Sequence, residues 1–148
     1  MTQPNHRPPG KDRRFIADEG FCPATHNGQQ GFKVKVRLTS YRSLPLSCIE
    51  AITLKIDGET IAADDITFIL NGHSLKLAEL DQLSKVWWFI LDYAELFVAR
   101  TQLLASGEHE VEGSLTTCEP YITAGRFTFV NSAKKRLMLE PGNLEIAV

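Results

Sequence analysis

Four histidines carry the side chains of this sequence that are best suited to bind a metal ion or to transfer protons. They are His6, His26, His73 and His109. None stands in the His-x-His or Glu-x-x-His spacing that often marks a metal site. His109 lies between two glutamates, but the alternation of a strand would point both glutamates to the opposite face. We therefore expect His109 to be a hydrogen-bonded residue near a turn, and we predict no metal ligand in this chain.

Nucleophiles and phosphate-binding loops are equally scarce. The sequence has no Gly-x-Ser-x-Gly elbow and no glycine-rich phosphate loop. Cys48 precedes an alternating apolar segment, where a cysteine is usually a small buried hydrophobe. The adjacent carboxylates Asp64 and Asp65 fit the cap of a turn better than acid–base chemistry. The sequence therefore predicts no catalytic residue in this chain.

Composition narrows the class of protein and of partner. The chain has 148 residues, a formal net charge of −2 and 43% apolar residues, which suits one domain with its own core. Such a weak charge argues against nucleic acid or an anionic membrane as the main partner. The basic cluster at residues 134–136 is more typical of a solvated turn or strand end than of a phosphate site. With three cysteines and no apolar signal region, we expect a cytoplasmic protein with reduced thiols.

Alternating apolar and polar residues predict an all-β fold. The period of two is clearest at residues 32–38, 52–57, 66–70 and 107–115. Asp57-Gly58 and Asn71-Gly72 follow such segments and are typical of tight hairpin turns. About eight or nine short strands, without alternating helices, predict an antiparallel β-sandwich with immunoglobulin-like or jelly-roll connections.

The same patterns predict three parts along the chain. Residues 1–30 would form a flexible tail and an arm, residues 31–140 the sandwich, and residues 141–148 a C-terminal tail. Within the sandwich, residues 76–83 indicate a short helix or a loop, and residues 92–95 indicate one helical turn. The apolar run from Val86 to Leu91 predicts a strand buried on both faces.

Two adjacent tryptophans stand within that run. On a strand, Trp87 and Phe89 share one face and Trp88 takes the other. One face should pack against the core. The tryptophan on the other face is then either exposed to solvent or covered by another part of the protein or by a partner. An indole there can fill a second packing layer, anchor a partner protein or stack on a sugar ring, and the sequence leaves these three possibilities open.

A second unusual stretch is a loop of mixed character. It consists of Tyr41, Arg42, Ser43, Leu44, Pro45 and Leu46. Loops that face only water are usually polar, so this composition suggests burial, either over one end of the sandwich or against another chain. These six residues, together with Trp87 and Trp88, are the candidate partner interface.

Several stretches spread from Gly31 to Leu139 occur together in one known family. They are Gly31–Leu38, Tyr41–Glu50, Ile52–Gly58, Ile66–Phe68 with Asn71-Gly72, Trp87–Phe89 and Gly107–Glu112. Through them the sequence resembles the β subunit of C-glycoside deglycosidases. The Tyr-Arg-x-Leu-Pro-Leu-Ser stretch at residues 41–47 is the most specific piece.

The resemblance implies a role inside a hetero-oligomer. A larger α subunit, a TIM barrel with a divalent metal usually taken as manganese, would carry the acid–base residues and bind the substrate. The complex would act as a lyase that cleaves the carbon–carbon bond between a sugar and a flavonoid or other aromatic aglycone in a 3-keto C-glycoside. This chain would be the small accessory subunit, with no cofactor of its own. The alternative is a stand-alone carbohydrate-binding or protein-interaction module.

Overall fold

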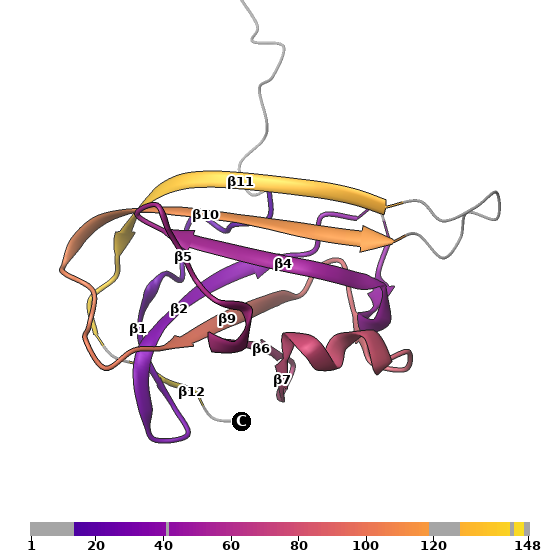
Figure 1. Ribbon diagram of the computed structural model, residues 1–148, viewed down its shortest axis with the longest axis horizontal. Coiled ribbons are helices and arrows are strands. Elements are labelled where there is room, and N and C mark those ends of the chain that lie inside the picture. The colour runs from indigo at the N-terminus through magenta and orange to yellow at the C-terminus, as the bar shows by residue number, and fades with distance from the viewer. Residues whose placement is uncertain (1–13, 41, 119–127, 143, 147–148) are drawn as a thin grey trace, which may run out of the picture.

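The chain folds into two packed β-sheets (Figure 1). The computed structural model describes residues 14–40, 42–118, 128–142 and 144–146. The larger sheet has the order β12 (Leu144–Ile146), β1 (Cys22–His26), β2 (Gln29–Arg37), β9 (Tyr93–Ala99), β6 (Ile66–Leu70) and β7 (His73–Lys76). The smaller sheet has the order β11 (Thr128–Leu139), β10 (Gly107–Cys118), β4 (Ile49–Ile56) and β5 (Glu59–Thr60). The expected all-β, sandwich-like fold is confirmed.

Three short 3-10 helices and one small strand pair complete the described part of the chain. The helices are η1 (Leu46–Cys48), η2 (Ala63–Asp65) and η3 (Leu77–Gln82). The pair consists of β3 (Leu44–Pro45) and β8 (Trp87–Trp88). Neighbouring strands pair antiparallel throughout the described residues, except that β1 and β12 run parallel.

Three hairpins turn through an Asn-Gly or Asp-Gly pair. Asn27, Asp57 and Asn71 have φ angles of 51°, 51° and 48°, and each is followed by a glycine that also has a positive φ. Two successive positive φ values match the right-handed twist of the flanking strands, so the chain can reverse within two residues. The hairpins expected at Asp57-Gly58 and Asn71-Gly72 are confirmed.

The main core lies between the two sheets because each strand points its apolar residues inward. Val34 and Val36 on β2 are fully buried in one cluster with Leu54 on β4 and Val111 and Leu115 on β10. Gly31 on β2 marks a close approach between strands. A Cβ atom there would lie 1.9 Å from the carbonyl oxygen of Val98 on β9.

Three local expectations are wrong. Phe15, Ile16 and Phe21 are buried in the main core, and Ile16 bridges to Val36, so the packed body begins well before residue 31. Residues 92–95 form no helical turn, because β9 begins at Tyr93. The run from Val86 to Leu91 is a strand only at Trp87–Trp88, and Leu91 is 88% exposed rather than buried.

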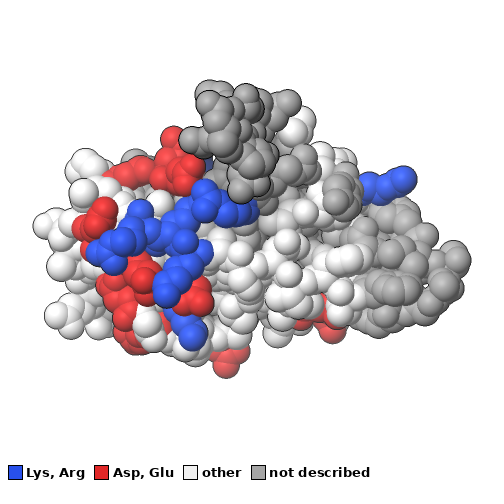
Figure 2. Space-filling view, turned by 90° about the horizontal axis from the view of Figure 1, so that it is seen from above, with Lys and Arg blue, Asp and Glu red and all other residues white. Residues whose placement is uncertain are grey.

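Charge is unevenly distributed over the outer face of the smaller sheet (Figure 2). One cross-strand row places Lys55 on β4, Glu112 on β10 and Lys134 on β11 side by side. Further along β4, the rows contain only uncharged residues. They are Thr53–Ser114–Ser132 and Ala51–Thr116–Val130. The face is therefore divided into a charged part and an uncharged part.

Candidate functional site

The two unusual stretches of the sequence lie side by side. Leu44 pairs with Trp88 and Pro45 with Trp87, and the N–H of Leu46 donates to the carbonyl of Val86 at 2.8 Å. This short ladder joins the loop at residues 42–46 to the aromatic run at one place on the surface. Tyr41 lies outside the described residues.

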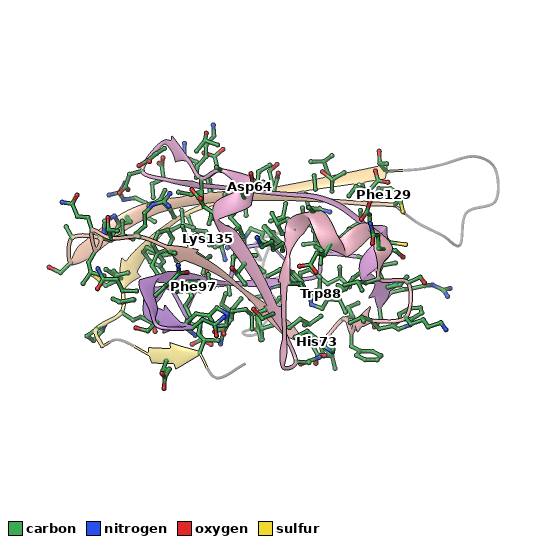
Figure 3. The ribbon with its side chains drawn as sticks, turned by 60° about the horizontal axis from the view of Figure 1, so that its bottom comes forward. Asp64, His73, Trp88, Phe97, Phe129 and Lys135 are labelled. Atoms are coloured by element: carbon green, nitrogen blue, oxygen red, sulfur yellow. The ribbon has the colours of Figure 1, made fainter. Side chains whose placement is uncertain are left out.

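Half of the candidate interface residues fill the interior of this chain. Trp88 is fully buried; its indole N–H donates to the carbonyl of Asp92 at 2.9 Å, and its ring meets Phe68 edge-on at 5.3 Å. Figure 3 shows Trp88 within the body of the molecule. Leu44 and Leu46 are also fully buried, and Pro45 is buried. These four side chains therefore pack this domain and leave little surface for another chain.

The remaining candidates form a shallow surface site. Arg42, Ser43, Trp87 and Phe89 line a hollow of about 600 Å³ that is open to solvent. Trp87 is 39% exposed and Phe89 is 55% exposed. The Ser43 hydroxyl accepts a hydrogen bond from the backbone N–H of Ile90 at 2.9 Å, which ties the loop to the segment after β8. We call these four residues the aromatic hollow.

Two aromatic rings beside a guanidinium define what the aromatic hollow can bind. The rings offer flat apolar area, and the guanidinium can pair with a carboxylate or stack on a planar group. Tryptophan and arginine are also the residue types most enriched among the energetic anchors of protein interfaces. The aromatic hollow therefore suits a protein surface that presents apolar and acidic groups together.

Phe89 lines the aromatic hollow but is not among the interface residues predicted from the sequence. Residues 87 and 89 of a strand share a face whenever residue 88 points inward. The sequence alone does not show whether that face points to solvent or to the core. The direction of that face follows only from the burial of Trp88 against Phe68, which lies on another strand.

The polar candidates have structural contacts. His109 is buried, with Nδ1 2.6 Å from Oδ2 of Asp57 and Nε2 2.6 Å from the carbonyl oxygen of Ala105. This confirms the expected hydrogen-bonded residue near a turn. Cys48 is a buried free thiol, also as expected. Asp64 and Asp65 lie in η2, where Asp65 is 3.4 Å from Arg100.

The other histidines and the basic cluster are spread over the structure. Buried His26 contacts the Ser74 hydroxyl through Nε2 at 2.9 Å, His73 is exposed at the start of β7, and His6 lies outside the described residues. Residues 134–136 belong to β11 rather than to a turn or strand end. Their ion pairs are Lys134–Glu110 at 3.6 Å, Lys135–Asp18 at 2.7 Å and Arg136–Glu108 at 3.2 Å.

The described residues contain neither a metal-binding cluster nor a membrane-spanning helix. Within the described residues, no three His, Cys, Asp or Glu side chains gather closely enough to hold a metal ion. No helix in that part of the chain is both long enough and apolar enough to cross a membrane. The aromatic hollow brings two exposed aromatic rings and an arginine together, and we take it as the candidate functional site.

Comparison with known proteins identifies the family. The family model described as "C-glycoside deglycosidase beta subunit" matches residues 11–121. A protein of that name from Microbacterium trichothecenolyticum is 42% identical over 89 residues, which cover 60% of this chain and 67% of the relative. A "3'-dehydrocarminate deglycosidase beta subunit" from Microbacterium sp is 31% identical over 111 residues, covering 74% of this chain and 83% of the relative. The chain therefore belongs to the C-glycoside deglycosidase beta subunit family.

Proposed function

We propose that this chain is the small subunit of a deglycosidase complex that cleaves the carbon–carbon bond of a 3-keto C-glycoside. Membership of the beta subunit family carries the proposal, because a beta subunit implies a partner subunit. The larger partner would be a TIM-barrel protein that binds the substrate and supplies the acid–base residues. This chain would stabilise that partner without taking part in the chemistry.

The proposed reaction starts at the keto group of the sugar. A carbonyl at C3 acidifies the neighbouring C–H bond, so a base can remove that proton and begin an elimination. The electron pair of that C–H bond forms a carbon–carbon double bond within the sugar as the bond to the aglycone breaks. The electron pair of the broken bond leaves with the aglycone carbon, which takes up a proton. A divalent metal, when bound, would polarise the carbonyl oxygen. The described residues of this chain offer no donor set for that ion, so we assign the metal to the larger subunit.

We place the contact with the larger subunit at the aromatic hollow. Trp87 and Phe89 expose large rings beside Arg42, and such residues gain most from being covered by a partner. The residues next to the hollow in the sequence are fixed in the core. They are Trp88, Leu44 and Leu46. A site that is already ordered loses little conformational entropy when a partner binds.

The test is co-expression of this chain with the neighbouring reading frames of its source genome. Size-exclusion chromatography with light scattering should show a stable hetero-oligomer with a barrel-type protein. That complex should release the aglycone from a 3-keto C-glycoside, and neither separated subunit should do so. A chain that stays without a barrel partner in all combinations would contradict the proposal. Glycan binding by the chain alone would then favour a free-standing carbohydrate-binding module.

A further inference from the structure

The strand β11 leaves one edge of the smaller sheet open. All twelve of its residues pair with β10 on one side. On the other side no described strand pairs with it. An open edge presents backbone N–H and C=O groups in a row, and the group that satisfies them best is another extended strand.

The two halves of this open edge differ in charge and in burial. The half from Ala133 to Leu139 carries the three ion-paired cations and alternates between buried and exposed residues. The half from Thr128 to Ser132 has no charged residue and no proline, and it is exposed on both faces. Phe129 is 46% exposed and Val130 is 64% exposed. Figure 3 labels Phe129 close to the start of β11.

Among the described residues, this half of the edge lacks the devices that usually protect a sheet edge. Natural edges are commonly blocked by lysine, proline, a bulge or a covering loop. Residues 128–132 pair with β10 in an unbroken register, and the hydrogen bonds of the described chain outside the sheets include none to their backbone. Within the described part of the chain, the outer edge of this segment is therefore unpaired and available to another strand.

A second copy of the chain fits this edge because the segment can pair with itself. Antiparallel pairing about a twofold axis sets residues of the same face opposite each other. With the axis beside Val130, Val130 meets its own copy, Thr128 meets Ser132 and Phe129 meets Asn131. No charged residue lies within the five paired positions. The uncharged rows that end at Val130 and Ser132 would then continue into the second copy.

We propose that residues Thr128–Ser132 of β11 pair antiparallel with the same residues of a second copy, so that two small sheets join into one. The inference is independent of the aromatic hollow, which contains no residue of β11. An assembly that contains the larger subunit would accordingly contain two copies of this chain in direct contact.

Two matched substitutions on β11 test the pairing. Val130 and Met138 both lie on the outer face and are 64% and 60% exposed, but only Val130 lies in the uncharged half. We expect the full-length chain to be a dimer by native mass spectrometry. Val130→Lys should raise the dimer dissociation constant at least about tenfold, since it sets two cations opposite each other, whereas Met138→Lys should leave the dimer unchanged. Circular dichroism and the Tm check that both variants fold.

Hydrogen exchange on the unmodified chain gives a second measurement that needs no variant. Within residues 128–132, the backbone amides that point away from β10 should exchange more slowly at high protein concentration than at low concentration, while those of Met138 and Leu139 should not change. A chain that stays monomeric at all concentrations, or two lysine variants that dimerise equally well, would overturn the proposal. So would a Val130→Lys variant that loses the larger subunit instead of the second copy, since the edge would then belong to that subunit.

Discussion

Asp57 holds His109 from across the smaller sheet and fixes the start of β10. Oδ2 of Asp57 lies 2.6 Å from Nδ1 of His109, and Oδ1 accepts the backbone N–H of Glu110 at 2.8 Å. The other ring nitrogen of His109 lies 2.6 Å from the carbonyl oxygen of Ala105. A carboxylate and a carbonyl can only accept, so His109 must donate from both nitrogens. The doubly protonated, cationic ring satisfies both partners.

This arrangement predicts that the stability of the protein falls as the pH rises above about 6.5. Burial alone would lower the pKa of His109, but the hydrogen bonds to Ala105 and Asp57 together hold that pKa above its ordinary value of 6.5. The cation therefore favours the folded state below about pH 6.5, and this contribution is lost as the pH rises through the folded pKa. Urea unfolding between pH 5 and pH 9 should show the decline.

His109→Gln provides the control for that pH dependence. Glutamine cannot become a cation, so the variant should be less stable than the unmodified protein by about 1.5–3 kcal/mol at acidic pH. Its stability should not fall further as the pH rises above about 6.5. The pKa of Asp57 is lowered by the hydrogen bond from His109 and by that from Glu110, so its own contribution disappears only as the pH falls through its folded pKa. If the stability of both proteins falls equally as the pH rises, the assignment of a cationic His109 is refuted.

Arg42→Ala should weaken assembly with the larger subunit more than it weakens folding. Arg42 is exposed and lines the aromatic hollow, so its removal should change the free energy of unfolding by no more than about 0.5 kcal/mol. Its loss from a buried interface should raise the dissociation constant of the complex at least about tenfold. Arg136→Ala is the matched control, because Arg136 is also exposed but lies on β11, outside the aromatic hollow. If both variants assemble normally, the aromatic hollow is not the contact.

The two tryptophans should have opposite effects when each is replaced by alanine. Trp88→Ala removes a fully buried ring from the core and should cost about 3–5 kcal/mol of stability. Trp87→Ala should change the free energy of unfolding much less, yet it should reduce binding of the larger subunit. Chemical denaturation and pull-down of the two variants separate these effects. A Trp88 variant as stable as the Trp87 variant would contradict the described packing.

Gly31 and Gly28 should differ sharply when replaced by alanine. At Gly31 the new Cβ would lie 1.9 Å from the backbone of Val98, so β2 and β9 would have to separate. We expect a loss of at least about 3 kcal/mol or a failure to fold. At Gly28 nothing lies within 4 Å, and only its φ of 77° opposes alanine, which should cost about 1–2 kcal/mol. Expression level and thermal unfolding distinguish the two variants.

Much of the sheet structure could be predicted from local sequence. Alternation places His109, Val111 and Leu115 on the buried face of β10, because a strand repeats every two residues whatever it pairs with. The Asp57-Gly58 turn is equally local, since its φ angles depend on these two residues and their flanking strands. Such features need no knowledge of distant parts of the chain.

The candidate site could be predicted only in part, because it depends on distant contacts. Trp87 and Trp88 have the same chemistry, and only the packing of Trp88 against Phe68 decides which of them is exposed. The ladder between β3 and β8 contains two residues of each strand. Two residues are too few to produce an alternating pattern of apolar and polar residues in the sequence. The apolar run from Val86 to Leu91 predicts a buried strand. In the structure only Trp88 of this run is buried.

The two-residue ladder between β3 and β8 makes recognition sensitive to changes in chain length. Because neighbouring residues of a strand point to opposite faces, a shift of the register by one position would turn Trp88 outward and Trp87 inward. A single residue inserted between Leu83 and Val86 would favour that shift while leaving Arg42, Ser43, Trp87 and Phe89 unchanged in the sequence. Relatives that differ in length at this point would consequently present different partner surfaces, even where their tryptophans, serine and arginine are identical.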